Sequence, residues 1–308
     1  MRSDFLIAQL DAFVFRCPIE TPVVTSFGVM RNRPAVFVRA EDTQGNVGWG
    51  ESWCNFPDVG AEHRARLVKS VFAPLVQGKH FASALDAFNL LKEKTAIWAI
   101  QAAEPGPMAQ CIAGIDTALW GMTARRAELP LWKLLGGEAS RVNVYASGIN
   151  PDAPAQLELA AVRLSEGRRA FKLKVGFGYE RDGENIKAVR DVIGDLPLMV
   201  DANQNWDLGT AIEMVDRLEP FNLNWLPPHQ FGWLSVRTWP EFDCTIESQA
   251  LQVIQPNVAK LRGYFSRSSD RKKDYRKSTG FLPILSRCRH RACRIGVFPC
   301  SRWRSWNA

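Results

Sequence analysis

The sequence predicts a protein with an α+β first part and a second part built as a parallel β/α barrel. Alternating strands are predicted at residues 5–16, 35–40 and 47–51, and residues 61–126 have helical periodicity, whereas strands and helices alternate regularly from residue 142 onward. The strand ends at Lys174, Asp201 and Leu226 are 27 and 25 residues apart. Strand–helix units of that size are typical of a parallel barrel, in which the chemistry lies where the strands end.

Length and composition indicate a globular protein without a membrane span. The 308 residues are enough for two domains with cores, and 46% of them are hydrophobic. No run of 18 or more apolar residues occurs, and the N-terminus lacks the pattern of a signal peptide. Seven scattered cysteines fit a reducing compartment better than a disulfide framework, so we predict a cytoplasmic protein.

The net charge of +7 is distributed unevenly along the chain. Residues 261–308 contain 13 Lys and Arg but only two acids, a balance of +11, and the other 260 residues have a balance of −4. Any argument from basicity to nucleic acid therefore concerns this tail alone. The tail has no recognisable nucleic-acid-binding fold, so a disordered basic segment is the favoured interpretation.

The first part should begin with an antiparallel meander. Residues 5–16, 35–40 and 47–51 alternate as strands, and residues 42–46 form a turn in which Gly45 suits a positive φ. Residues 21–33 contain Pro22, Gly28 and two arginines, and we predict a mobile loop there.

Helices should follow this meander. A buried stripe at helical spacing and the small residues between 113 and 118 predict a closely packed helix. Residues 130–137 should form a short helix ended by glycine. The stripe consists of Ile112, Ile115, Leu119 and Met122.

The second part should contain four strands and three helices before residue 227. The helices are predicted at residues 155–166, 182–193 and 208–218. The strands are predicted at residues 142–146, 171–175, 196–200 and 223–226.

Polar side chains at two of these strand ends form the candidate site. Alternation puts Lys172 and Lys174 on one face of their strand, and the same period brings Asp201 and Asn203 together. Two inward ammonium groups are costly unless something uses them. A carboxylate can hold a divalent cation, and a lysine crowded by a like charge can take a proton. Alternatively, the lysines lie on an exposed edge and Asp201 caps the next helix.

Six motifs lie in sequence at residues 48–51, 113–120, 134–137, 172–174, 200–203 and 255–260. In their order and spacing they resemble the mandelate racemase/muconate lactonizing enzyme family of the enolase superfamily. The resemblance implies an α+β N-terminal capping domain over a modified (β/α)7β, TIM-like barrel. It also implies an Mg²⁺ ion and removal of the proton α to the carboxylate of a small substrate, as in racemases, sugar-acid dehydratases and cycloisomerases.

The resemblance also assigns roles to individual residues. Lys174 would be the base, and Lys172 would make it easier to deprotonate and would neutralise the substrate carboxylate. Asp201 would bind Mg²⁺, Asn203 would assist substrate contacts, and Lys260 could face the site. Arg31 and Arg33 lie in a segment that often covers the substrate in this family, with solvated charges as the alternative. A homo-oligomer is compatible with all of this.

The chain departs from the family pattern after residue 226. The family has Glu-Glu-Pro where this sequence has Pro227-Pro228-His229, so the second metal carboxylate is missing. A third acid would have to come from Glu241, Asp243 or Glu247, which nothing places at a strand end. The barrel is thus predicted to be incomplete after its fourth strand, and the metal site to lack two of its three carboxylates.

Several interpretations of this departure stay open. Residues 227–244 and 262–308 could be translated out of frame or belong to a decaying gene, and a real lineage-specific tail is the rival account. In function, the chain could be an impaired enzyme or an inactive remnant. A basic nucleic-acid-binding tail is the least favoured, and Cys288, His290 and Cys293 have no second regular pair to complete a zinc site. The predicted domains are a cap at 1–130, a partial barrel at 131–260 and a basic tail at 261–308.

Overall fold

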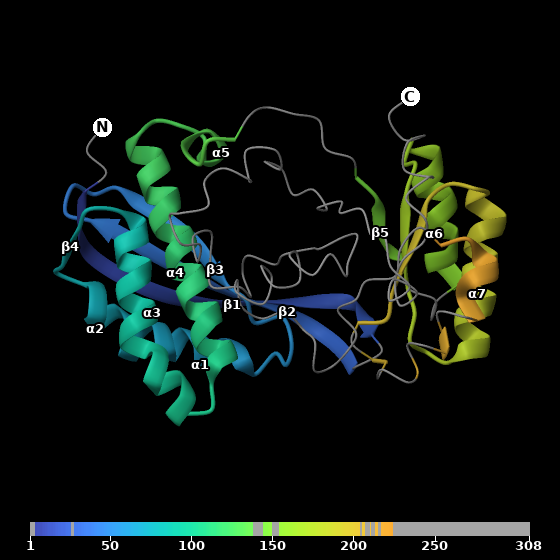
Figure 1. Ribbon diagram of the computed structural model, residues 1–308, viewed down its shortest axis with the longest axis horizontal. Helices are drawn as coiled ribbons and strands as arrows, with labels where there is room; N and C mark the ends of the chain where they lie inside the picture. Colours follow the sequence, from blue (N-terminus) through green and yellow to red (C-terminus); the bar gives the residue numbers. More distant parts are fainter. Residues whose placement is uncertain are drawn as a thin grey trace, which may run out of the picture.

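The computed structural model describes two parts of the chain, each with its own hydrophobic core (Figure 1). The first core is formed by buried residues between Phe5 and Met122, and the second by buried residues between Ala146 and Leu223. The described residues are 4–25, 28–137, 144–149, 154–203, 205–206, 210, 213–214 and 217–223.

The first part has a four-stranded antiparallel sheet in the order β3-β2-β1-β4. Its strands are β1 (Phe5–Thr25), β2 (Gly28–Asp42), β3 (Val47–Ser52) and the short β4 (His80–Phe81). The predicted turn between β2 and β3 is confirmed. Gly45 has φ +82°, and the Asp42 carboxylate accepts hydrogen bonds from the backbone N–H groups of Gln44 and Asn46, at 2.9 Å each.

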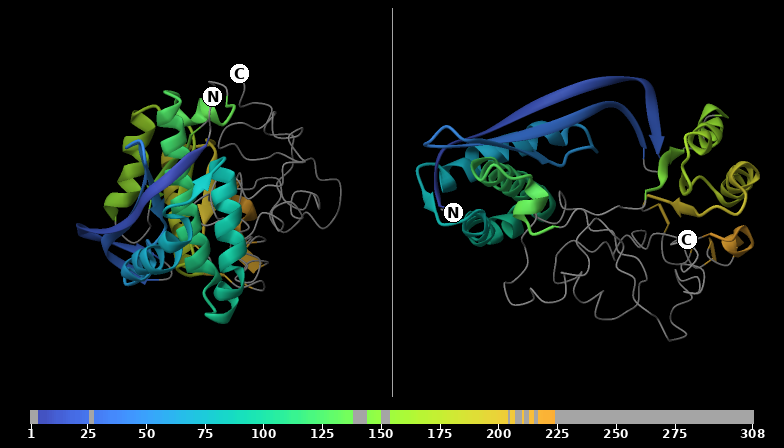
Figure 2. Two further views of the ribbon diagram at one scale, coloured as in Figure 1. Left: turned by 90° about the vertical axis from the view of Figure 1, so that its left-hand side faces the viewer. Right: turned by 90° about the horizontal axis from the view of Figure 1, so that it is seen from above.

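The prediction of a loop over residues 21–33 is wrong for the described residues of that segment. Strands β1 and β2 continue through it as a two-stranded ribbon, in which Val23 pairs with Met30 and Thr25 with Gly28. Pro22 lies within a register shift of the ladder between Pro18 and Val23, so proline interrupts the pairing without ending it. The ribbon extends from the first part toward the second (Figure 2).

Helices cover one face of this sheet (Figure 1). The helical segment predicted for 61–126 is confirmed, although it is divided by turns and by β4. It comprises α1 (Gly60–Leu67), a π-helical turn (Val68–Phe72), α2 (Ala73–Val76), α3 (Ala84–Gln101) and α4 (Pro105–Arg126), and the predicted short helix follows as α5 (Leu131–Leu134).

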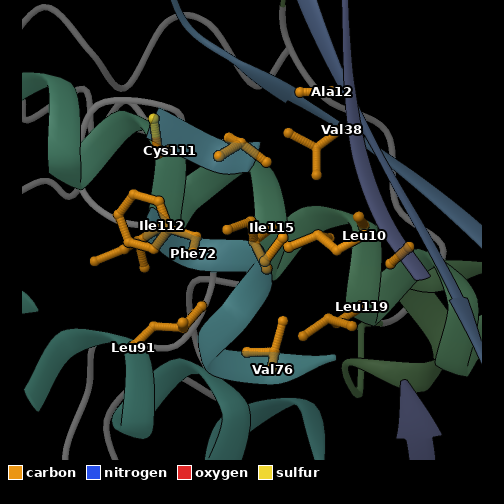
Figure 3. Packing of buried hydrophobic residues seen from close by; sticks show 14 of the residues in the cluster. Leu10, Ala12, Val38, Phe72, Val76, Leu91, Cys111, Ile112, Ile115 and Leu119 are labelled. Atoms are coloured by element: carbon orange, nitrogen blue, oxygen red, sulfur yellow. The ribbon is translucent and has the colours of Figure 1, made fainter. Parts of the chain in front are cut away.

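The predicted stripe on α4 is the centre of the first core. Ile112, Ile115, Leu119 and Met122 are at most 2% exposed. Figure 3 shows the first three of them among Phe72, Val76 and Leu91 from the helices and Leu10 and Val38 from the sheet.

The small residues of α4 are needed because β3 lies directly against the helix. A Cβ atom at Gly48 would lie 1.9 Å from the Ala118 carbonyl oxygen, and one at Gly50 would lie 2.0 Å from the Gly114 carbonyl oxygen. Both contacts are with backbone atoms, which cannot move aside without shifting the helix. Glycine at 48 and 50 therefore sets the distance between the sheet and α4.

The second part repeats strand and helix as predicted. Strands β5 (Ala146–Ile149), β6 (Phe171–Lys174) and β7 (Leu198–Asp201) form a parallel sheet in that order. Helix α6 (Pro154–Ser165) connects the first two strands and α7 (Tyr179–Ile193) the next two. Residues 210, 213–214 and 217–218 are helical, in agreement with the helix predicted at 208–218, and a 3₁₀ turn (Glu219–Phe221) follows.

The strand predicted at 142–146 is misplaced, since β5 begins at Ala146 and Val144 precedes it. Pairing with β6, between Ala146 and Phe171 and between Ile149 and Leu173, fixes the strand further along the chain. The strand predicted at 223–226 is not confirmed at Leu223, and residues 224–226 lie outside the described residues.

The rest of the predicted barrel and the basic tail also lie outside the described residues. The boundaries of the three predicted domains therefore stay predictions.

The cysteines among the described residues are free thiols. Cys17, Cys54 and Cys111 are not in disulfides. Burial raises the pKa of the Cys111 thiol to about 12 and also raises the pKa of Cys54. Neither buried thiol is thus suited to act as a nucleophile. Among the helices that the structure describes, none is long and apolar enough to cross a membrane.

Replacing Gly50 by alanine should destabilise the first part, because the new methyl group would overlap the backbone of α4. We expect the free energy of unfolding to fall by about 1–3 kcal/mol, as for other overpacked cores. Gly106 is the matched control, since it lies in α4 itself and a Cβ atom there would have no other atom within 4 Å. Gly106→Ala, at an exposed position in the first turn of the helix, should change the free energy of unfolding by no more than about 0.5 kcal/mol in the same urea titration. Equal effects of the two substitutions would contradict the close-packing argument.

Candidate active site

The candidate site lies where β6 and β7 end. Lys174 pairs with Asp201 in the parallel register, and Lys172 pairs with Met199. Phe171 and Leu173 are fully buried in the core behind the sheet, so the alternating lysines point to its other face. The predicted alternation along this strand is confirmed.

Both lysines bind the same carboxylate oxygen. The Lys174 Nζ donates a hydrogen bond to Asp201 Oδ2 at 2.7 Å, and the Lys172 Nζ lies 3.2 Å from that oxygen. The Lys174 Nζ also donates to Asn203 Oδ1 at 2.7 Å. The structure thus brings all four predicted residues of the two strand ends into one cluster.

The lysines are not on an exposed edge, as the alternative interpretation required. The side chains are 13% exposed at Lys172, 25% at Lys174 and 16% at Asp201. Asp201 does stabilise the turn after β7, because its Oδ1 accepts from the Asn203 backbone N–H at 3.0 Å. Asn203 has φ +50°, a left-handed conformation that asparagine tolerates. The carboxylate therefore holds this turn with one oxygen and both ammonium groups with the other.

The electrostatics of Asp201 follow from these contacts. Burial raises the pKa of its carboxyl group, whereas the charge and hydrogen bond of Lys174, the charge of Lys172 and the Asn203 N–H lower it. The lowering contributions prevail, so the pKa lies below its ordinary value of 3.8 and Asp201 is ionised near neutral pH.

Sequence reasoning missed Tyr145. The Lys172 ammonium lies 5.3 Å from the centre of the Tyr145 ring, within the range of a cation–π contact. Ala170 and Met199 are buried beside this ring. The position of Tyr145, immediately before a strand that neighbours the lysine strand, is the signal that could have indicated it.

Other candidate side chains make contacts elsewhere. The Arg33 guanidinium donates to Asn55 Oδ1 at 3.1 Å, and Arg31 is exposed. Neither observation tests a substrate contact. Lys260 lies outside the described residues, as do Pro227, Glu241, Asp243, Glu247 and the possible zinc ligands Cys288, His290 and Cys293.

The described residues do not make a complete magnesium site. Mg²⁺ takes six oxygen ligands in near-octahedral geometry, including one or two carboxylates. Asp201 has the chemistry of such a ligand, but within the described ranges no group of three or more His, Cys, Asp and Glu side chains could hold a metal ion. A metal ion at this edge of the sheet would therefore combine Asp201 with ligands from water, from substrate or from residues beyond those ranges.

Comparison with known proteins identifies the family. The model of the mandelate racemase/muconate lactonizing enzyme N-terminal domain matches residues 9–136, and the enolase C-terminal domain-like model matches residues 156–226. A 3,6-anhydro-alpha-L-galactonate cycloisomerase from Streptomyces coelicolor is 30% identical in an alignment of 285 positions that covers 84% of this chain and 77% of that relative. The chain belongs to the mandelate racemase/muconate lactonizing enzyme family of the enolase superfamily.

Solved structures agree with this assignment. A family member from Bordetella bronchiseptica RB50 is 44% identical, with a TM-score of 0.74 over 84% of this chain and 74% of that one. A racemase from Streptomyces coelicolor A3(2), solved with bound magnesium, is 30% identical, with a TM-score of 0.73 over 84% and 78% of the two chains. The predicted fold class, a capping domain with a TIM-like barrel, is confirmed.

The similarity to the family does not extend over the whole chain or over the full length of every relative. The enolase C-terminal match ends at residue 226, immediately before Pro227-Pro228-His229. The chain also spans only 57% of a D-Ala-D/L-Ala epimerase and 54% of a D-galactarolactone cycloisomerase, which are further relatives. Relatives thus include racemases, epimerases and cycloisomerases, and the reaction of this chain is a matter for proposal.

Replacing Asp201 by asparagine should leave two largely buried ammonium groups without their counter-charge. We expect the free energy of unfolding at pH 7 to fall by about 1–3 kcal/mol. Because folding lowers the pKa of Asp201, its contribution is present above pH 3.8 and is lost as the pH falls through the folded-state pKa. The difference between wild type and variant, measured by urea unfolding at pH 7 and pH 3, should therefore shrink in acid. Asp191→Asn, at an exposed position on α7, is the control, and a pH-independent difference would contradict the assignment.

Proposed function

We propose that this chain removes the proton next to the carboxylate group of a small acid, with Lys174 as the base. The observation that carries the proposal is the cluster of Lys172, Lys174 and Asp201 at two adjacent strand ends. In a parallel barrel this is the edge where substrates bind. The family assignment and the sugar-acid relative support the substrate class.

The contacts of the two lysines indicate a different role for each. Lys174 is the more exposed of the two and is held by two acceptors, so its amine has a fixed direction. A base must first be neutral, which requires Lys174 to release a proton and exchange its bond to Asp201 for one to the substrate. Lys172 is more buried and its ammonium group lies beside the Tyr145 ring, where it can balance the substrate carboxylate.

Asp201 would be a magnesium ligand. Asn203 would contact the substrate or the residues that surround the metal ligands. The solved racemase with bound magnesium supports this cofactor for the family. When bound, the ion would supply stabilisation of the negative charge that develops on the substrate. The racemase, dehydratase and cycloisomerase outcomes share this first proton transfer, and nothing in the described site selects among them.

We further propose that magnesium binding and activity are impaired in this chain. Pro227-Pro228-His229 contains no carboxylate at the position where the family has its second metal acid. Each missing carboxylate removes a charge and a fixed ligand. A non-catalytic remnant is the second candidate function, and the same sequence feature favours it. Resequencing the DNA across codons 220–308 would separate a genuine chain from a frameshift. Glu-Glu-Pro after residue 226 in a corrected reading frame would support the frameshift, and its absence from every frame would contradict it.

Exchange of the α proton tests the base directly. Wild-type protein with Mg²⁺ and galactonate or other sugar acids in D₂O should incorporate deuterium at the α carbon, as followed by proton NMR. Lys174→Met should lower the exchange rate by about 10²–10⁴-fold, because a positioned base is lost. Lys187→Met, at an exposed position on α7, should leave the rate unchanged. Exchange that persists in Lys174→Met would overturn the assignment of the base, and a wild type without exchange would favour the remnant.

Calorimetric titration with Mg²⁺ tests the metal ligand independently of turnover. Any binding heat of the wild type should disappear in Asp201→Asn, since the variant lacks the carboxylate. Asp191→Asn should bind as the wild type does. Unchanged binding in Asp201→Asn would place the ion elsewhere, and absent binding in the wild type would support the proposed impairment.

A further inference from the structure

A set of hydrogen bonds joins the turn after β6 to the turn after β7. The residues that form these bonds are not among the base, substrate or metal residues proposed for the site. Asp182, on α7, is fully buried, and its carboxylate accepts from the backbone N–H groups of Gly176 at 2.8 Å and Phe177 at 3.2 Å. The Asn205 side chain donates to the Gly176 carbonyl oxygen at 2.7 Å. Gly176 is thus held from both sides, by a residue of α7 and by a residue of the turn after β7.

The backbone conformation and the surroundings of Gly176 both favour glycine. Its φ is +99°, and a Cβ atom there would lie 3.2 Å from the Ala202 carbonyl oxygen and 3.3 Å from the Asn205 Cβ. The two turns are therefore in direct contact at this point. The Val175 N–H also donates to the Asp201 carbonyl oxygen at 3.1 Å, which continues the strand pairing up to the contact.

Asp182 does not act as an ordinary helix cap. Helix α7 begins at Tyr179, and Gly178 at its N-cap makes no side-chain capping bond. A capping side chain accepts from N–H groups within the first turn. Asp182 instead accepts from Gly176 and Phe177, which precede the helix. The carboxyl group of Asp182 stabilises the conformation of the turn, and these hydrogen bonds offset the cost of burying a polar group.

We propose that Asp182 and Asn205 are positioning residues that keep Lys174 against Asp201. Gly176 is two residues from Lys174, and Asn205 is four residues from Asp201. Tying Gly176 to both Asp182 and Asn205 fixes the backbone beyond each functional side chain, so the 2.7 Å contact between the Lys174 Nζ and Asp201 is kept. The catalytic part of this inference rests on the proposed function, whereas the positioning of Lys174 does not.

The first test measures the reactivity of individual lysines and needs no turnover. Reductive methylation with formaldehyde and cyanoborohydride, in the presence of EDTA, is read out by fragmentation mass spectrometry. In Asp182→Asn and Asn205→Ala, labelling of Lys174 should rise several-fold while labelling of Lys172 changes little. Lys172 is the internal reference because it lies two residues further from the joined turns, within the strand.

The control is Glu180→Gln, which removes an exposed acid from the same end of α7 and should leave both lysines unchanged. An unchanged ratio of Lys174 to Lys172 labelling in both variants would overturn the proposal. An equal rise at both lysines would overturn it too, because general loosening of the fold would then be the cause. If Asp182→Asn does not fold, Asn205→Ala at its exposed position still decides the question.

The second test uses deuterium exchange at saturating substrate. Asn205→Ala should lower the maximal rate by about 10²-fold with an unchanged KM, since a base displaced by about 1 Å loses its geometry. Asn205→Gln, which keeps the donor, should recover part of the rate. A raised KM with an unchanged maximal rate would contradict positioning of the base. If the wild type shows no exchange, the proposed function fails, and the labelling ratio still decides whether the two turns position Lys174.

Discussion

The carboxylate of Asp201 is the contact on which the site depends. Two ammonium groups within a few ångströms of each other repel, and each loses hydration when its side chain is largely buried. Asp201 Oδ2 lies within 3.2 Å of both, so one ionised oxygen compensates two charges. Its other oxygen fixes the turn that carries Asn203. Charge compensation and backbone conformation are therefore coupled at a single side chain.

The parallel register explains why these groups meet. Neighbouring residues on adjacent parallel strands point to the same face, so pairing Lys174 with Asp201 brings their side chains together without any special loop. The apolar alternation of Phe171 and Leu173 fixes that register, because a shift by one residue would place the lysines in the core. The core behind the sheet thus determines the chemistry in front of it.

The sequence allowed the central features to be predicted, because they follow from short-range periodicity. The spacing of Lys172 and Lys174 and the strand interval to Asp201 were sufficient to place three of the site residues together. The error at residues 21–33 arose because Pro22 and Gly28 were interpreted as ending the strands. Cross-strand pairing of Val23 with Met30 overrides those local signals. The roles of Asp182 and Asn205 could not be predicted, since their contacts join segments whose proximity depends on the tertiary fold.

The charge balance of the described cluster bears on which ligand it favours. Lys172 and Lys174 contribute two positive charges and Asp201 one negative charge, so these three side chains are positive overall. A divalent cation entering such a cluster would be repelled by both lysines at short range, and it gains only one carboxylate in return. A substrate carboxylate would instead be attracted to Lys172 and Lys174. Further acids are what convert an arrangement of this kind into a metal site, and Pro227-Pro228-His229 provides none at the position where the family has its second. As far as the described residues extend, the cluster is therefore better suited to hold an anion than to hold magnesium.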